Sequence, residues 1–480
     1  MIDRLASDSR RVAPGAAFFA WPGEAADGRR FIPQAIERGC SAVVWESEGF
    51  AWDGGWKVPN AGVKGLKQQA GLLAHEFYGR PSESLWICGV TGTNGKTSCS
   101  QWLAHVFSLK EIKTGVIGTL GSGFPGALRE IPNTTPDALE LHRMLAEMKH
   151  AGASGVAMEV SSHGLDQGRV NGVAFDCALF TNLTHDHLDY HGTMAAYGEA
   201  KARLFDAPGL QAAVLNLDDP FGVRLAGRAG ARGVRTIGYG LAHATGARDA
   251  VSEFVVARDI RLEDGGIRVA LQSSWGEAEA TLDQIGQFNV ANALGVLGCL
   301  LARGVPFDEG VALLPALPPV PGRMQKIAAQ AGCPLVVVDY AHTPDALDKV
   351  LRALHPVAQA RGGRLVAVFG AGGDRDADKR PLMGAIASRL ADRVVLTSDN
   401  PRSENSAAIA AAIRRGVSGE CVVELDRETA IASAIQGAGP ADVVLVAGKG
   451  HEEYQEIAGT RLPFSDASVA EAALGRRGNT

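Results

Sequence analysis

The stretch GVTGTNGKTS at residues 89–98 decides how the middle of this chain folds. It follows the apolar run Leu85–Val90, which is typical of a buried strand, and it precedes the helical pattern Gln101–Leu109. Glycines let backbone N–H groups approach phosphate oxygens, and the N-terminus of a helix favours anions. A strand, a glycine-rich loop and a helix in this order predict a nucleotide-binding P-loop.

Two side chains of this loop have a direct role in binding a nucleoside triphosphate. Lys96 is placed to reach the terminal phosphates, and the Thr97 hydroxyl is a ligand for Mg²⁺. The strict motif has a glycine where this sequence has Val90, so a glycine-rich turn without a ligand is the alternative. The further expected nucleotide contacts are Gly92, Thr93, Asn94, Gly95 and Ser98. The loop predicts triphosphate binding but not the reaction that it drives.

The overall composition is typical of a globular protein of the cytoplasm. Hydrophobic residues make up 46% and charged residues 21% of the chain, and the net charge is −6. No block of like charge indicates a nucleic-acid partner, and neither an N-terminal signal nor a long apolar stretch indicates a membrane. The seven cysteines form no C-x-x-C pair, which argues against a disulfide framework or structural zinc and favours a reducing compartment.

Apolar runs that alternate with helical stretches predict an α/β fold with parallel sheets buried on both faces. A chain of 480 residues exceeds one core, so we expect about three domains. Breaks lie at residues 78–82 and 317–323, the second with three prolines in four residues. We therefore predict a smaller N-terminal α/β domain at 1–82, a central P-loop mononucleotide-binding domain at 83–320 and a C-terminal doubly wound, Rossmann-like domain at 321–480.

Polar residues end two apolar runs that should lie beside the P-loop strand. One run ends at Glu159, and the run 177–183 leads into His185–His191, which holds three histidines and two aspartates. Glu159 is a suitable anion near the Mg²⁺ of a nucleotide, and His187 is a candidate nitrogen ligand or phosphate contact. A solvated turn is the alternative for Glu159. A zinc site is the alternative for the histidines, but Cys177 completes no ligand set.

Four apolar runs in the C-terminal third also end in polar turns. In a doubly wound sheet ligands bind outside the carboxyl ends of the strands, so these turns are expected to line one crevice. Arginine side chains bind carboxylates through paired hydrogen bonds, and carboxylates bind ammonium groups. A crevice that holds both charges therefore suits an amino acid. The alternative is that these turns are ordinary polar loops without a ligand. The runs are Leu335–Asp339, Arg364–Phe369, Arg393–Thr397 and Asp442–Val446, and the charged residues after them include Arg375, Asp399, Arg402, Lys449 and Glu452.

These motifs together resemble the Mur ligases over nearly the whole chain. The family has a variant P-loop without the first glycine, as found here at residues 91–98. The other similar segments are 7–15 and 27–32 of a uridine-nucleotide-binding domain, 133–136, 158–170 and 181–192 of the central domain, and 286–293 and 339–344 around the nucleotide. The N-terminal segments resemble those of the ligase that adds the third residue of the cell-wall peptide.

The resemblance implies an ATP-dependent amide-bond ligase of peptidoglycan synthesis, with ATP and Mg²⁺ as cofactors. It implies UDP-N-acetylmuramoyl-L-alanyl-D-glutamate as a substrate of domain 1–82, ATP in domain 83–320 and an amino acid in domain 321–480. The expected amino acid is meso-2,6-diaminopimelate, and the expected intermediate is an acyl phosphate. We expect a cytoplasmic monomer without nucleic-acid or membrane partners.

The resemblance also assigns residues to roles. The implied catalytic residues are Lys96, Glu159, His187 and Lys201. The implied metal ligands are Thr97, Glu159, His187 and Lys201. Read alone, Lys201 is a surface lysine, but the resemblance makes it a carbamylated lysine (carboxylysine). The implied ATP contacts outside the P-loop are Asn289, Asn292, Arg323 and Asp339. The implied muramoyl-peptide contacts are Ser9, Asn133, Thr134, Thr135, Ser161, Gln167 and Arg169, and the implied amino-acid contacts are Arg375, Asp399, Asn400, Arg402, Gly448 and Glu452.

The sequence DNPR at residues 399–402 resembles the signature of family members that add meso-diaminopimelate. Arg402 would pair with the far carboxylate, and lysine would leave a partly buried guanidinium unpaired. A lysine-adding ligase is the nearest alternative. A folylpolyglutamate synthetase lacks the uridine-type N-terminal domain. A P-loop regulatory protein, which uses nucleotide as a switch, leaves the four C-terminal polar turns without a role.

Overall fold

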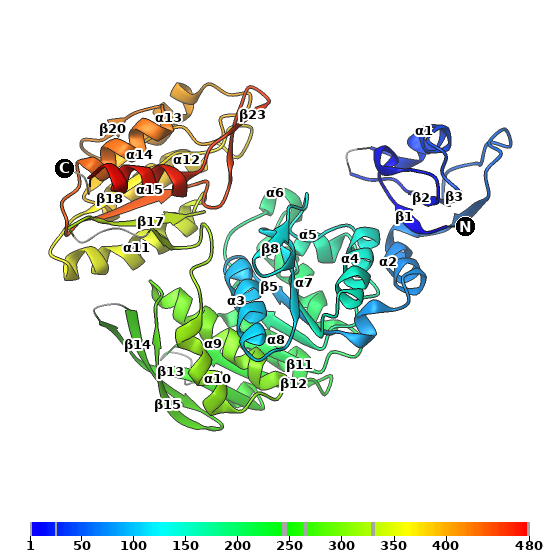
Figure 1. Cartoon of the computed structure of the whole chain (residues 1–480), viewed down its shortest axis with the longest axis horizontal. Coiled ribbons are helices and arrows are strands. Elements are labelled where there is room, and N and C mark those ends of the chain that lie inside the picture. Colours follow the sequence, from blue (N-terminus) through cyan, green and yellow to red (C-terminus); the bar gives the residue numbers. More distant parts are fainter. Residues whose placement is uncertain (1, 25, 242–246, 264–265, 328–331, 478–480) are drawn as a thin grey trace. The chain divides into compact units, whose positions relative to one another are not determined.

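The chain packs as two compact units, which Figure 1 traces in chain order from the blue N-terminus to the red C-terminus. The computed structural model describes residues 2–24, 26–241, 247–263, 266–327 and 332–477. The first unit comprises residues 1–258, 271–278 and 292–314, and the second comprises residues 259–270, 279–291 and 315–480.

The N-terminal sheet has four parallel strands in the order β1-β2-β3-β4. Alternate residues of β2 face opposite sides, so Phe18 packs with Ile32 of α1 while Phe19 packs with Leu66 of α2. One helix therefore covers each face. The elements are β1 (Arg4–Ala6), η1 (Ser9–Arg11), β2 (Ala16–Ala20), η2 (Gly28–Phe31), α1 (Ile32–Glu37), β3 (Ala42–Glu46), β4 (Asn60–Val63), α2 (Leu66–Phe77) and η3 (Pro81–Ser84).

The central sheet has eleven strands in the order β15-β14-β13-β12-β11-β10-β5-β9-β6-β7-β8. Its strands are β5 (Trp86–Thr91), β6 (Thr114–Gly118), β7 (Gly121–Phe124), β8 (Ala127–Arg129), β9 (Gly155–Glu159), β10 (Cys177–Phe180), β11 (Ala212–Asn216), β12 (Arg235–Gly240), β13 (Glu253–Glu263), β14 (Gly266–Ser273) and β15 (Gly276–Leu282). Its helices are α3 (Lys96–Leu109), α4 (Ala138–His150), α5 (Ser162–Asp166), α6 (Leu188–His191), α7 (Met194–Ala202), η4 (Arg203–Asp206), α8 (Pro220–Gly230), α9 (Gln287–Ala302), α10 (Phe307–Leu313) and η6 (Leu314–Ala316).

Strand β5 lies between β9 and β10, and both neighbours run parallel to it. Ile87 belongs to a core shared with α4 and α8, whereas the next residue, Cys88, faces Cys299 of α9 on the other side. Helices therefore cover both faces of the parallel part, and the carboxyl ends of β5, β9 and β10 meet at one edge.

The C-terminal sheet has the order β16-β17-β21-β18-β19-β20, parallel except for β16. Val337 packs with α11, α12 and α13, and Val336 and Val338 pack with α14 and α15, so the sheet is doubly wound. The elements are β16 (Gln325–Ile327), β17 (Leu335–Asp339), α11 (Pro344–Ala360), β18 (Leu365–Phe369), α12 (Lys379–Leu390), β19 (Arg393–Leu396), α13 (Ser406–Arg414), β20 (Val422–Val423), α14 (Arg427–Gln436), β21 (Val443–Ala447), β22 (Tyr454–Ile457), β23 (Thr460–Pro463) and α15 (Asp466–Arg477).

The predicted α/β class and the doubly wound C-terminal sheet are confirmed. The strand predicted at Leu335–Asp339 has those bounds. The strands predicted at Arg364–Phe369 and Arg393–Thr397 are each one residue shorter, at Leu365–Phe369 and Arg393–Leu396. The strand predicted at Asp442–Val446 lies one residue later, at Val443–Ala447. The domain boundaries near residues 82 and 320 stay predictions, because the contacts group the N-terminal sheet with the P-loop part in one unit. Within the described ranges, no helix is both long and apolar enough to cross a bilayer.

Candidate functional site

The P-loop occupies the end of β5, directly before α3. Gly95 has a φ of 87° at the N-terminus of α3. Gly92 has a φ of 147°, and a Cβ there would lie 1.9 Å from Thr181 Oγ1, so only glycine fits. Val90 is buried inside β5, so the departure from the strict motif falls in the strand and leaves the turn unchanged.

The end of β10 holds this loop in place. Thr93 N donates to Asn182 O at 2.8 Å, and Asn94 N donates to Asn182 Oδ1 at 3.0 Å. Thr181 Oγ1 donates to Asn94 O at 2.6 Å. Thr181 and Asn182 were not among the predicted site residues, although their place after a strand next to β5 was a usable signal.

Lys96, Thr97 and Glu159 lie at this sheet edge. Lys96 Nζ donates to Gly92 O and Thr93 O, both at 2.8 Å, so its ammonium group lies over the loop. Thr97 Oγ1 donates to Glu159 Oε2 at 3.1 Å. Glu159 is fully buried, so its interpretation as a solvated turn is wrong. A hydroxyl beside a buried carboxylate is a donor set that fits a hard cation such as Mg²⁺.

His187 lies at the N-terminus of α6 with a φ of 53°. Its ring contacts those of His163, at 4.9 Å between centroids, and Tyr197, at 6.0 Å. Burial lowers the pKa of His187, which favours the neutral imidazole that binds metal ions. Within the described ranges, the only close triplet of metal-binding side chains is Cys88, Cys177 and Cys299, so His185–His191 supplies no zinc ligand set there.

Lys201 is buried in α7, so its interpretation as a surface lysine is wrong. Its Nζ donates to Gly92 O at 2.9 Å and lies 4.4 Å from the centre of the Tyr197 ring. Burial lowers the pKa of Lys201 well below its usual value, and the nearby charge of Lys96 lowers it further. An uncharged amine is nucleophilic, so this environment fits a lysine that adds carbon dioxide.

The candidate muramoyl-peptide residues of the central sheet surround the end of β9. Thr135 Oγ1 donates to Glu159 O at 3.0 Å and accepts from Ser161 N at 2.9 Å. Thr134 Oγ1 lies 3.0 Å from Thr119 Oγ1, and Thr119 donates to Glu159 Oε2. Arg169 donates to Thr135 O at 2.9 Å and to Gln167 Oε1 at 2.6 Å. The structure thus brings Thr134, Thr135, Ser161, Gln167 and Arg169 together.

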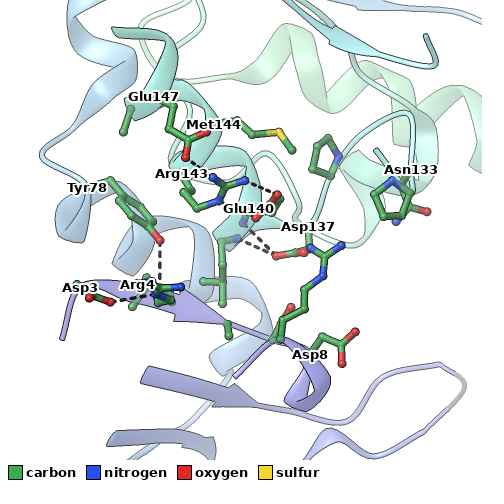
Figure 2. Close-up of a pocket in the computed structure, with 18 of the residues that line it drawn as sticks. Asp3, Arg4, Asp8, Tyr78, Asn133, Asp137, Glu140, Arg143, Met144 and Glu147 are labelled. Atoms are coloured by element: carbon green, nitrogen blue, oxygen red, sulfur yellow. Dashed lines mark hydrogen bonds and ion pairs between the residues drawn. The ribbon is translucent and has the colours of Figure 1, made fainter. Parts of the chain in front are cut away.

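Two cavities lie beside the N-terminal sheet. Asn133 lines one of about 870 Å³, where Figure 2 shows Arg143 between Glu140 and Glu147. Ser9 lines the other, of about 530 Å³, together with the aromatic residues Phe19, Trp21 and Phe31. The Ser9 hydroxyl donates to Gln34 Oε1 at 2.7 Å.

The candidate adenine and nucleotide residues outside the P-loop are divided between the two units. Asn292 lies against the P-loop, since a Cβ on Gly95 would be 2.5 Å from Asn292 Oδ1. Asn289 donates to Ile285 O at 2.9 Å in the second unit. There Arg323 lies over the Tyr340 ring at 4.5 Å. Buried Asp339 accepts from Met324 N and Ala341 N, and burial raises its pKa.

The candidate amino-acid residues gather at the carboxyl ends of β18, β19 and β21. A Cβ on Gly448 would lie 2.2 Å from Asp399 Oδ2, so only glycine at this position leaves room for the carboxylate. Arg402, with a φ of 51°, donates to Gly373 O at 2.6 Å and lies 3.9 Å from Glu456. Arg375 is exposed in the loop after β18.

Asn400 and Glu452 are joined by a hydrogen bond from Asn400 Nδ2 to Glu452 Oε2 at 2.7 Å. Lys449 does not line the crevice as predicted, because it is completely buried. Its Nζ donates to Asn400 Oδ1 and Glu452 Oε2, both at 2.9 Å. This end of the sheet therefore carries arginines and carboxylates, together with one buried lysine.

Three family models match successive parts of the chain. They are "Mur ligase family, catalytic domain" at residues 2–78, "Mur ligase middle domain" at residues 90–300 and "Mur ligase, glutamate ligase domain" at residues 322–450.

Whole-length relatives agree with these matches. The chain is 50% identical to the UDP-N-acetylmuramoyl-L-alanyl-D-glutamate–2,6-diaminopimelate ligase of Chromobacterium violaceum, over 98% of this chain and 94% of the relative. It is 51% identical to the ligase of that name from Pseudomonas aeruginosa, over 99% and 95%. A solved structure of a ligase of that name is 36% identical with a TM-score of 0.70, and the match covers 100% of this chain and 96% of that one. The chain therefore belongs to the Mur ligase family.

Proposed function

We propose that this chain is an ATP-dependent ligase that joins meso-2,6-diaminopimelate to the D-glutamate of UDP-N-acetylmuramoyl-L-alanyl-D-glutamate. The observation that carries the proposal is the identity of about half of all residues, along nearly the full length, to ligases named for this reaction. The arginines and carboxylates of the C-terminal crevice support it, because they suit a ligand with two carboxylates and two ammonium groups. We place this step of peptidoglycan synthesis in the cytoplasm and expect a monomer with domains 1–82, 83–320 and 321–480.

ATP is proposed to bind with its phosphates in the P-loop, where Lys96 lies over the loop carbonyls. Thr97, Glu159 and His187 would hold Mg²⁺, which neutralises phosphate charge when bound. Asn289, Asn292, Arg323 and Asp339 are the proposed contacts for the rest of the nucleotide. The donor set favours this assignment, because Thr97 and Glu159 already share a hydrogen bond.

The muramoyl dipeptide is proposed to extend from the N-terminal cavities to the end of β9. Phe19, Trp21 and Phe31 offer aromatic faces for a uracil ring beside Ser9. Asn133 lies along the path. Thr134, Thr135, Ser161, Gln167 and Arg169 would contact the sugar and peptide. This places the D-glutamate near Lys96, where its negative charge is offset.

The chemistry is acyl activation. A carboxylate is a poor electrophile, so one side-chain carboxylate oxygen of D-glutamate attacks the γ-phosphorus of ATP and ADP leaves. An uncharged amine of diaminopimelate then attacks the acyl carbon, and the tetrahedral intermediate loses one proton from nitrogen and expels phosphate to form the amide. Lys96 stabilises the charge that develops on the phosphoryl oxygens.

Lys201 is proposed to carry a carbamate. Its neutral amine adds to carbon dioxide and loses one proton, which converts a cation into an anion able to bind a metal ion. Its low pKa supports this proposal, because only the unprotonated amine reacts.

The amino acid is proposed to bind among Arg375, Asp399, Asn400, Arg402, Gly448 and Glu452. Arg402 would pair with the carboxylate that diaminopimelate has and lysine lacks. Its present partners are a carbonyl and Glu456 at 3.9 Å, so a closer carboxylate would improve its pairing.

Phosphate release by the purified chain tests the proposal. We expect release only with ATP, the UDP-muramoyl dipeptide and meso-diaminopimelate together, and far slower release with L-lysine. Equal release with lysine would favour the lysine-adding ligase. Hydrolysis of ATP that needs neither the dipeptide nor an amino acid would favour the P-loop switch and contradict a ligase.

A further inference from the structure

Lys449 follows β21 and lies completely buried behind the proposed amino-acid site. Its Nζ is 2.9 Å from both Asn400 Oδ1 and Glu452 Oε2, and Asn400 Nδ2 is 2.7 Å from the same Glu452 oxygen. These three side chains form a closed triangle of hydrogen bonds. Lys449 has no exposed surface, and its ammonium group is engaged by Asn400 and Glu452.

The triangle fixes which carboxylate oxygen Glu452 presents. Both hydrogen bonds reach Oε2, and Oε1 accepts none from the part of the chain that the structure describes. The Glu452 side chain is 17% exposed. Because Oε2 accepts hydrogen bonds from Asn400 and Lys449, Oε1 is the oxygen that remains for an ammonium group of a ligand.

Asn400 is oriented by the same contacts. Its Oδ1 accepts from Lys449 Nζ and from Glu456 N, at 2.9 Å each. Because both partners are donors, the amide oxygen must face them, and the NH₂ group must face Glu452. Lys449 thus ties the end of β19 to the segment that carries Glu452.

The buried ammonium group also balances charge. Asp399 and Glu452 both bring carboxylates to this end of the sheet, and Asp399 lies against Gly448, the residue before Lys449. Without Lys449, Glu452 would lose its only salt bridge among the described residues, and the buried Arg427 would remain as a more distant cation. A carboxylate that lacks its partner in a partly buried place reorients toward solvent.

We propose that Lys449 is a positioning residue that aims Glu452 Oε1 at an ammonium group of the incoming diamino acid. This inference rests on the proposed ligase function and adds a residue that acts only through Glu452 and Asn400.

The test is the KM of each substrate for Lys449→Met, which keeps the length of the side chain without its charge. We expect the KM for meso-diaminopimelate to rise roughly 10- to 100-fold, the size of one lost charged hydrogen bond, with the KM values for ATP and the UDP-muramoyl dipeptide unchanged. Asp442→Asn is the matched control, because Asp442 is a buried charge just before the start of β21. It should change none of the three KM values.

A double-mutant cycle separates positioning from a merely structural role. If Lys449 acts through Glu452, adding Lys449→Met to Glu452→Gln should raise the KM for diaminopimelate no further than about twofold. The double variant also leaves no unpaired carboxylate, so it remains informative if Lys449→Met alone does not fold.

Additive effects in the cycle would overturn the inference, as would an unchanged KM for diaminopimelate in folded Lys449→Met. A parallel rise in all three KM values would also overturn it. Absence of diaminopimelate-dependent phosphate release by the unaltered chain would instead overturn the proposed function, and the inference with it.

Discussion

Lys201 in the first unit and Lys449 in the second are both buried, but their surroundings differ in kind. Lys201 donates to a neutral carbonyl, that of Gly92, and the nearby charge of Lys96 opposes its own. Lys449 donates to a carboxylate, that of Glu452, at the same distance of 2.9 Å. Burial alone therefore does not decide what a lysine does.

The hydrogen-bond partner of each lysine decides what its site is suited for. Burial with no anion in hydrogen-bond contact favours the neutral amine of Lys201, which reacts with carbon dioxide. Lys449 instead forms a buried ion pair with Glu452. One lysine is thus suited to be modified and the other to hold a neighbour in place. Four predictions test this contrast, from the largest expected effect to the smallest.

Replacing Lys201 with Met should lower kcat by about 10²- to 10³-fold, the size expected for removing one group that stabilises transition-state charge. Protein equilibrated with ¹³C-bicarbonate should give one carbamate signal in its ¹³C spectrum, and Lys201→Met should lack that signal. Lys449→Met should retain it. A carbamate signal that survives in Lys201→Met would contradict the contrast.

His142 is a third buried base without an anion, and burial lowers its pKa to about 4. Its Nε2 lies 3.0 Å from Asn171 O. The unfolded chain then binds this proton between about pH 6.5 and 4 while the folded chain does not, so stability falls as pH falls through that window. Neutral His142 contributes about 3 kcal/mol to this loss of stability, because one pKa unit corresponds to about 1.4 kcal/mol.

Urea unfolding of His142→Gln at pH 7.5 and 4.5 checks this contribution. The free energy of unfolding should fall between pH 7.5 and pH 4.5 in both proteins. In the variant this fall should be smaller by roughly 2–3 kcal/mol. His150→Gln, on the exposed side of the same helix, is the control and should lose as much as the unaltered chain. An equal loss for His142→Gln would show that this histidine does not titrate as proposed.

Replacing Arg402 with Ala should lower kcat/KM for meso-diaminopimelate by roughly 10- to 100-fold, because the far carboxylate loses its charged hydrogen bonds. The kcat/KM for L-lysine should change little, so the preference between the two amino acids should narrow. Competition assays with both amino acids measure this ratio. An unchanged ratio would remove Arg402 from the choice of substrate.

Lys349 pairs with Asp345 at 2.8 Å on the surface of α11, a contact as short as that of Lys449. Because water screens this pair, Lys349→Met should change the free energy of unfolding by no more than about 0.5 kcal/mol. Calorimetry gives the loss in free energy of unfolding for Lys349→Met and for Lys449→Met. The difference between the two losses shows how much burial adds to the stabilisation from the same kind of contact. A loss as large as that of Lys449→Met would contradict this ranking.

The sequence predicted the parts of the fold that depend on local pattern. The apolar runs predicted the strands, and the polar residues after them predicted the ends of β5 and β9, where Thr97 donates a hydrogen bond to Glu159. The eleven-stranded extent of the central sheet was not predicted, because the alternation in Glu253–Leu282 was not used as a strand signal.

Burial of charged side chains was the part that local pattern did not reveal. Lys201 looks like a surface lysine in its own segment, and Lys449 was predicted to line the crevice. The buried surroundings of both come from residues far away in the chain. Gly92, for example, lies 109 positions from Lys201, and Asn400 lies 49 positions from Lys449. Only the resemblance to a family pointed to Lys201 as a site residue, and nothing in the sequence pointed to the position of Lys449 behind the crevice.

The most direct test of acyl activation follows oxygen from the substrate. The UDP-muramoyl dipeptide is labelled with ¹⁸O in the D-glutamate side-chain carboxylate and converted with ATP and meso-diaminopimelate. We predict that each phosphate released carries one oxygen from that carboxylate, because phosphate leaves with the oxygen that it received. Phosphate without ¹⁸O, at full conversion to amide product, would contradict an acyl phosphate intermediate.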